Sequence, residues 1–345
     1  MKRRHLEAAL FAVAALGVLR CGFAGVVISQ VYGGGGNTSA TYTHDFVELF
    51  NNDAIPVSLG GWSVQYASAL GSTWSVTVLP NVVVQPGGYF LIEEASGGAV
   101  GAVLPTADAN GLINLSSTSG KVALSSSTAE LSGICPASGA TRDFVGYGSA
   151  DCFDGNAAAP GINSAAADIR STPCIDTNFN DLDFDANPPI PRNSATSPAP
   201  CPTVGFAVVQ FPKAATIGAC EAFPVYGQVY VAGVTDASPQ PGVGITGQLG
   251  IGPDGSDPAS SPGWKWYEAI PNPGYLFSGN DDEYVRSITL HASATLDYAY
   301  RFAYGNQSYV YADGTGTTDG YSAADAGQLV VDGDVIYCDR FDDAP

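Results

Sequence analysis

The chain has 345 residues, enough for about two domains that each bury a core of their own. Glycine (42) and proline (23) are abundant, and methionine occurs once. The net charge of −20 disfavours direct binding to nucleic acid, whose phosphates it would repel. No stretch beyond the N-terminus keeps an apolar period of 3.6 residues, so the composition predicts an all-β protein with many turns.

The N-terminus predicts a Sec-type signal peptide at residues 1–24. A basic start, Met1 to Arg4, precedes an apolar segment from Ala8 to Leu19, and small residues precede the predicted cleavage after Ala24. A membrane helix is the competing interpretation, but this segment is too short for a hydrocarbon layer of ~30 Å. We therefore expect a secreted protein, extracellular or at the cell surface, with no transmembrane segment.

The cysteines predict disulfide bonds. Removal of Cys21 with the signal leaves an even number, as is usual for exported chains. Metal ligation by thiolates is the alternative, but C-x-x-C is absent and histidine is scarce. The positions of the remaining cysteines favour the pairs Cys135–Cys152, Cys174–Cys201 and Cys220–Cys338.

The first half alternates between short apolar runs and turns. Val26–Tyr32 predicts a strand, and a glycine loop leads to a second strand at 45–52. There Val47 and Leu49 point to one face, while Phe46, Glu48 and Phe50 point to the other. Further strands are expected at 59–66, 74–84, 89–92, 112–115, 121–124 and 142–147, with 112–115 and 121–124 forming a hairpin.

The order of these motifs resembles a known family. The motifs are Val27-Ile28-Ser29-Gln30-Val31, Asp45 to Asn51, Leu59-Gly60-Gly61-Trp62, Pro86 to Ile92, Leu112 to Leu115 and Gly120 to Leu124. Together they resemble a lamin tail domain of the exported bacterial type, over residues 26–200. The resemblance implies an immunoglobulin-like β-sandwich, a module often fused to secreted nucleases or phosphoesterases. The chain has no room for such a catalytic domain, so the resemblance implies a fold and not an activity.

An Asp-rich loop is the strongest candidate for metal chemistry. Its oxygen-bearing side chains at short spacing would suit Ca²⁺: Asp176, Asn178, Asn180, Asp181, Asp183 and Asp185. The pattern begins like an EF-hand loop, but Asp181 replaces the glycine of the sixth position and Asn187 the glutamate of the twelfth. The alternative is that the Asp and Asn side chains cap turns while Phe179 and Phe184 pack on the sandwich.

A segment rich in Pro, Ser and Ala predicts a linker at 188–202. It separates a first domain (26–187) from a second (203–338), and a short tail (339–345) follows. Seven strands are expected in the second domain, near 206–212, 225–231, 245–251, 264–267, 283–288, 296–304 and 328–331. The chain is thus predicted as two immunoglobulin-like antiparallel β-sandwiches, the second resembling accessory modules of secreted bacterial proteins.

Aromatic residues concentrate in the second domain. Trp264, Trp266, Tyr275 and Tyr309 could stack on sugar rings, as aromatic platforms do in carbohydrate-binding modules. By contrast, Tyr298, Tyr300, Phe302 and Tyr304 share one strand face, which is typical of a core. A second acidic cluster at 280–283 is expected to be a solvated turn, with a cation site as the alternative.

No pattern of catalytic residues emerges. Beyond the signal only His44 and His291 remain, one in each half, and neither G-x-S-x-G nor H-E-x-x-H occurs. We predict a secreted, non-catalytic binding, adhesion or scaffold protein whose ligand is a protein or polysaccharide, with no cofactor except a candidate Ca²⁺. The alternatives are an accessory module of an extracellular nuclease or phosphoesterase system, and a carbohydrate-binding protein.

Overall fold

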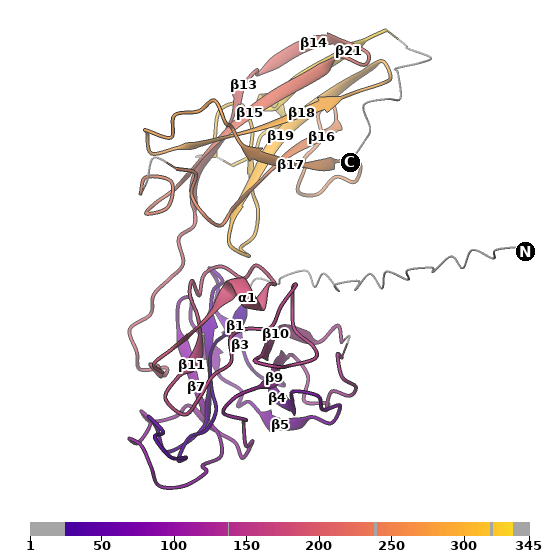
Figure 1. Ribbon diagram of the computed structural model, residues 1–345. Helices are drawn as coiled ribbons and strands as arrows, with labels where there is room; N and C mark the ends of the chain where they lie inside the picture. Colours follow the sequence, from indigo (N-terminus) through magenta and orange to yellow (C-terminus); the bar gives the residue numbers. More distant parts are fainter. Residues whose placement is uncertain (1–24, 137, 238–239, 318–319, 334–345) are drawn as a thin grey trace, which may run out of the picture.

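A computed structural model describes residues 25–136, 138–237, 240–317 and 320–333. Figure 1 shows two β-rich bodies connected by an extended segment. The predicted signal peptide, Cys338 and the predicted tail (339–345) lie outside the described residues. Within the described ranges, no helix has the length and apolar character needed to cross a membrane.

The first body is a sandwich of a six-stranded and a four-stranded sheet. Their strand orders are β12-β11-β1-β2-β7-β8 and β10-β9-β4-β5, and β3 pairs with β6. All pairs are antiparallel except β7–β8. The bounds are β1 Val26–Tyr32, β2 Phe46–Asn51, β3 Val57–Ser58, β4 Ser63–Ser68, β5 Ser75–Val78, β6 Val83–Val84, β7 Tyr89–Glu93, β8 Ala109–Asn110, β9 Gly120–Ser125, β10 Thr141–Tyr147, β11 Ala167–Arg170, α1 Asn180–Asp183 and β12 Phe184–Asn187.

Strand β2 divides its side chains as its period of two predicts. Val47 and Leu49 enter the core between the two sheets. Phe46 and Phe50 join separate apolar clusters on the opposite face, where Glu48 is fully buried as well. Both faces of this strand are therefore covered, which the alternation alone did not predict.

The predicted hairpin of 112–115 with 121–124 does not form. Residues 111–116 form no strand, and β9 pairs instead with β4 and β10. The backbone of this segment donates to buried carboxylates: Ile113 N to Glu94 Oε2 at 2.8 Å and Leu115 N to Asp45 Oδ2 at 2.9 Å. These side chains replace the hydrogen bonds that a neighbouring strand would have supplied.

Residues 188–202, predicted as a linker, lie along the first sandwich and are called the strap here. The side chain of Gln30 exchanges two hydrogen bonds with the backbone of Ile190, at 2.6 and 3.0 Å. Further along, Ala199 N donates to Gly87 O at 2.9 Å. The connection between the two bodies therefore begins only after the strap.

The second body has the strand order β13-β15-β18-β17-β16-β19-β21-β14, with β20 paired to β19. Strands β17 and β18 meet at two residue pairs only, so the sheet folds over at this corner and encloses a core. The bounds are β13 Val204–Phe211, β14 Ala214–Gly218, β15 Ala222–Val231, β16 Ile245–Pro253, β17 Lys265–Pro271, β18 Asp282–Thr289, β19 Ala294–Tyr304, β20 Val310–Ala312, η1 Ala323–Asp325 and β21 Gly327–Asp332. Strands β14 and β20 add to the seven that the sequence predicted.

The row of aromatic side chains on the inner side of β19 forms the centre of the second core. Tyr298, Tyr300 and Phe302 are fully buried, and Tyr304 is 6% exposed. Tyr300 donates its hydroxyl to Val225 O at 2.8 Å, which satisfies the polar end of a buried ring. The prediction of a core role for this face is confirmed, and the chain is all-β with two sandwiches.

Candidate binding sites

Arg170 lies at the centre of the Asp-rich loop. Its guanidinium, fully buried at the end of β11, reaches Asp143 Oδ2 at 2.8 Å, Asp183 Oδ2 at 3.0 Å and Asp176 Oδ1 at 3.2 Å. Its Nε donates to Ile28 O at 3.0 Å. Two of the predicted calcium ligands, Asp176 and Asp183, thus face an internal cation supplied by the chain.

Three buried carboxyls share this one guanidinium. Burial raises the pKa of Asp183 to about 6, although Arg170 and a hydrogen bond from Thr177 oppose the shift. Burial also raises the pKa of Asp143, against the opposing charge of Arg170. Replacing the guanidinium would leave buried negative charges close together, so the cluster has a structural role.

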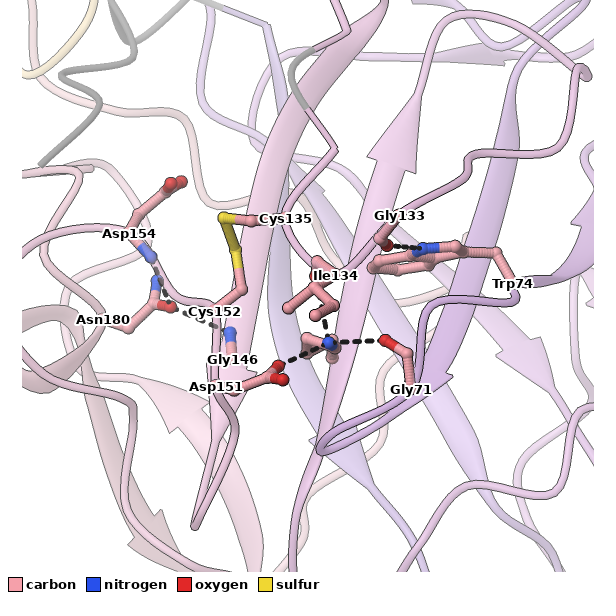
Figure 2. The surroundings of a disulfide bond; sticks show 11 residues. Gly71, Trp74, Gly133, Ile134, Cys135, Gly146, Asp151, Cys152, Asp154 and Asn180 are labelled. Carbon is pink, nitrogen blue, oxygen red and sulfur yellow. Dashed lines mark hydrogen bonds and ion pairs between the residues drawn. A yellow bond between two sulfur atoms is a disulfide. The ribbon is translucent and has the colours of Figure 1, made fainter.

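The other predicted ligands point elsewhere. Asn180 Oδ1 accepts from Gly146 N and Asp154 N, as Figure 2 shows, and Asp185 Oδ2 accepts from the Ser171 hydroxyl. Asn178 adopts the left-handed region with φ 57°, and Asp181 is exposed on α1. The described residues contain no group of three or more His, Cys, Asp or Glu side chains arranged to hold a metal ion. The structure gives the calcium prediction no support, and calcium binding stays a prediction.

Two predicted disulfides, Cys135–Cys152 and Cys174–Cys201, form. Cys220 is also disulfide-bonded, while its predicted partner Cys338 lies beyond the part of the chain that is described. Figure 2 shows the surroundings of Cys135–Cys152. A fully buried lysine, Lys121, stabilises this loop by donating to Gly71 O, Ile134 O and Asp151 Oδ1 at 2.8, 3.0 and 2.6 Å.

Glu48 holds the strap on the outer face of the large sheet. Its carboxylate accepts from Arg192 Nη2 at 2.7 Å and from Arg192 N at 2.6 Å. Ser29 and Gln30 donate to it from β1 at 2.6 and 3.1 Å. The guanidinium of Arg192 also lies over the Tyr89 ring, 4.0 Å from its centroid. Glu48 is thus part of the framework, fully hydrogen-bonded and closed to solvent.

The sequence did not reveal Arg170, Lys121 or Arg192 as central residues. The sequence feature that points to them is the small number of basic residues: the chain has only 13 Lys and Arg against 33 Asp and Glu. In so acidic a chain, a basic residue within an apolar run is a candidate partner for a buried carboxylate.

A group of aromatic side chains gathers on the outer surface of β16, β17 and β19. We call it the aromatic face: Trp264, Trp266, Arg301, Tyr309, Tyr311 and Tyr321, all half-buried. The indoles of Trp264 and Trp266 are within 19° of parallel, with centroids 5.8 Å apart. Tyr321 meets Trp264 edge-on at 6.4 Å, and Tyr311 lies 5.7 Å from Trp266.

Glycines on β16 let the two indoles lie against the strand. A Cβ at Gly252 would be 2.2 Å from Trp264 Cε2, and one at Gly250 would be 2.6 Å from Trp266 Cζ3. Trp264 is further fixed by its Nε1, which donates to Ser256 Oγ at 2.9 Å. The local sequence Gly-x-Gly on one strand and Trp-x-Trp on the next therefore builds a flat surface.

Arg301 lies between two rings of the aromatic face. Its guanidinium carbon is 4.0 Å from the Trp266 centroid and 4.1 Å from that of Tyr309. Its Nε donates to Gln248 Oε1 at 2.7 Å, and Gln248 in turn donates to Glu268. Arg301 therefore covers one face of the Trp266 ring and one face of the Tyr309 ring.

The structure brings together three of the four predicted stacking residues. Trp264, Trp266 and Tyr309 share the aromatic face, whereas Tyr275 lies apart, in edge-to-face contact with Phe277 at 5.1 Å. In the predicted acidic cluster, Asp282 and Glu283 are buried, so the expectation of a fully solvated turn is wrong for these two.

His44 and His291 each lie near a polar side chain. Thr43 Oγ1 lies 3.0 Å from His44 Nδ1, and Cys220 Sγ lies 3.7 Å from His291 Nδ1. Neither contact supplies a carboxylate that would orient an imidazole as a general base.

The family model of the Lamin Tail Domain matches residues 22–149. No curated protein matches the chain. The matched range includes β1 to β10 and ends before the Asp-rich loop, the strap and the second sandwich. Residues 22–149 are therefore a lamin tail domain, as the ordered motifs of the first half indicate.

Proposed function

We propose that the protein is a non-catalytic binding protein of the cell exterior, and that it holds polysaccharide on the aromatic face of its second sandwich. The observation that carries the proposal is the pair of nearly parallel indoles, Trp264 and Trp266, lying against Gly252 and Gly250. The lamin tail domain supplies a sandwich fold and does not itself indicate a ligand.

The chemistry of the aromatic face suits sugars. A sugar ring presents an apolar surface of C–H groups that packs on an indole, and hydroxyls that need polar partners at its edge. Arg301 lies over the Trp266 ring, and its hydrogen-bonded neighbours Gln248 and Glu268 offer such partners. Because hydrogen bonds and glycine contacts already fix the indoles, little side-chain entropy is lost on binding.

The placement outside the cell rests on the disulfides. Cys135–Cys152 and Cys174–Cys201 require an oxidising compartment to persist. The lack of catalysis rests on the absence of recognisable catalytic motifs in the sequence. An accessory role beside a separate nuclease or phosphoesterase is the second candidate, and it rests on the lamin tail domain at residues 22–149.

The experiment is affinity electrophoresis of the full chain through gels that contain neutral or acidic polysaccharides. We expect retardation by at least one polymer, and Trp264→Ala should weaken it at least about fivefold, since stacking on one ring contributes about 1–3 kcal/mol. Tyr230→Ala, on β15 and outside the aromatic face, is the matched control. No retardation, or equal retardation of Trp264→Ala, contradicts the proposal; hydrolysis of DNA or p-nitrophenyl phosphate contradicts its non-catalytic part.

A further inference from the structure

A cavity of about 420 Å³ opens between the β15–β16 and β17–β18 connections of the second sandwich. Its walls include Pro241, Pro271, Pro273, Tyr275 and Phe277. This volume is typical of small-ligand sites. The prolines make the wall stiff because proline fixes its backbone φ, and Gln240 and Asn272 add polar groups to it. None of these residues belongs to the aromatic face.

Two aromatic rings line the cavity, those of Tyr275 and Phe277. Tyr275 and Phe277 meet edge-to-face, with centroids 5.1 Å apart and planes 89° apart. The face of an aromatic ring carries negative potential and attracts cations within about 6 Å. A ligand with a positive end and an aliphatic body would therefore find two compatible surfaces in one cavity.

Two acidic residues, Asp282 and Glu283, accept hydrogen bonds from residues at the cavity wall. Asn272 lines the cavity and donates through N to Glu283 O at 2.7 Å and through Nδ2 to Glu283 Oε1 at 2.5 Å. Gly242, next to the wall residue Pro241, donates to Asp282 Oδ2 at 2.6 Å. Asp281 is the last residue of the β17–β18 connection, and Asp282 and Glu283 begin β18, so three consecutive acidic residues lie next to this wall.

The ion pairs of the described residues do not include these three carboxylates. Those pairs join Lys121, Arg170 and Arg192 to other acidic residues, all in the first sandwich. Asp282 is fully buried, and its Oδ1 has no hydrogen-bond partner among the described atoms. A buried carboxylate oxygen without a partner is costly, and a nearby cation would offset that cost.

The three carboxylates act electrostatically on Tyr275. Burial raises the pKa of Tyr275, and the charges of Asp281, Glu283 and Asp282 raise it further. Burial likewise raises the pKa of Asp281 and of Asp282. A positive ligand would relieve this accumulation of negative potential, whereas an anion would add to it.

We propose that this cavity binds a cationic amine, an ammonium or guanidinium group on an aliphatic stem. The stem packs against the prolines and the rings of Tyr275 and Phe277, and the charge lies toward Asp281 and Glu283. The group can belong to a free polyamine or to a basic side chain of a partner protein. This inference is independent of the proposed polysaccharide binding.

The test is isothermal titration of the full chain with three probes. Spermidine represents a free polyamine, acetyl-lysine-amide (blocked only at its backbone ends) represents a basic side chain, and acetyl-norleucine-amide is the neutral control. We expect heat from at least one cationic probe and none from the control; which cation binds identifies the source. Tyr275→Ala should weaken binding about tenfold and Asp281→Asn at least threefold.

Two matched variants keep the result interpretable. Asp325→Asn makes the same charge change at an exposed position away from the cavity and should bind as the parent does. Trp264→Ala removes a ring of the aromatic face and should leave amine binding unchanged, which separates this site from the polysaccharide site. Absence of heat with both cations at millimolar concentration, equal binding of the norleucine probe, or insensitivity to both cavity substitutions would overturn the proposal.

Discussion

Arg192 Nη2 donates to the fully buried Glu48 Oε1 at 2.7 Å, across 144 residues of sequence. The pair connects β2, inside the lamin tail domain, to the strap that follows the domain. Without the strap, Glu48, Phe50 and Tyr89 would form an open face of the large sheet. The strap thus completes the first sandwich.

Replacing Arg192 tests this dependence. Arg192→Met leaves the Glu48 carboxylate buried without its main partner, and we expect a loss of about 3 kcal/mol in the free energy of unfolding. Urea unfolding measures it. The double variant Glu48→Gln/Arg192→Met should recover part of the loss because the buried charge is gone. A loss below 1 kcal/mol in the single variant would mean that the strap is held by other contacts.

The stability of the first sandwich should decrease as pH rises. Burial raises the pKa of Asp45 to about 6, of Glu94 to about 7 and of Asp168 to about 8. These carboxyls stay protonated in the folded chain up to those values but ionise near pH 4 when unfolded. The stability they contribute is complete below about pH 4 and is lost as pH rises toward 8.

Asp168 is the most informative of the three because neither of its oxygens has a hydrogen-bond partner among the described residues. Asp168→Asn removes the ionisation, so the decline in unfolding free energy between pH 6 and 9 should become shallower. Urea unfolding at several pH values measures the slope of the unfolding free energy against pH. Hydrogen exchange then reports on β1, the strand paired with that of Asp168, and on β2. Glu130→Gln, at an exposed position of the same sandwich, should leave the slope as it is.

The Cys174–Cys201 disulfide should hold the end of the strap. It closes a loop of 27 residues, for which loop entropy predicts a stabilisation of about 3.5 kcal/mol. The double Cys→Ser variant at 174 and 201 should therefore become sensitive to limited proteolysis within 188–202. The same change at Cys135 and Cys152 is the control and should not expose the strap. Equal cleavage of both variants would contradict this assignment.

The local sequence pattern predicted those features of the structure that depend on residues close together in the chain. Three features followed from spacing within single segments or short loops: the alternation of β2, the buried row of rings on β19 and the two disulfides. The strap did not follow, because Pro, Ser and Ala favour an extended chain whether it is free or held. The prediction of a hairpin at 112–115 was wrong because the side chains of Glu94 and Asp45 accept the backbone hydrogen bonds that a partner strand would have accepted.

The candidate sites show the same limit. Asp and Asn at short spacing indicate oxygen ligands, but the spacing does not say which cation they face. Arg170 lies only six residues before Asp176, yet its contact with Asp143 depends on the pairing of β11 with β1. Trp264 and Trp266 were found from sequence, whereas Arg301 joined them only through the pairing of β16 with β19.

The Trp264 indole lies flat against Gly252 on β16. Polysaccharide binding can therefore be tested by changing the glycine, with every aromatic residue kept. In Gly252→Ala the new Cβ would lie 2.2 Å from Trp264 Cε2, so the indole must move off the strand. We expect a loss of retardation of at least about fivefold in affinity electrophoresis, with the unfolding free energy within about 1 kcal/mol of the parent because the face lies on the surface. Gly218→Ala on β14, whose Cβ would meet nothing closer than 3.8 Å, is the matched control and should bind normally. Unchanged retardation of Gly252→Ala would show that the seating of Trp264 does not matter for the ligand.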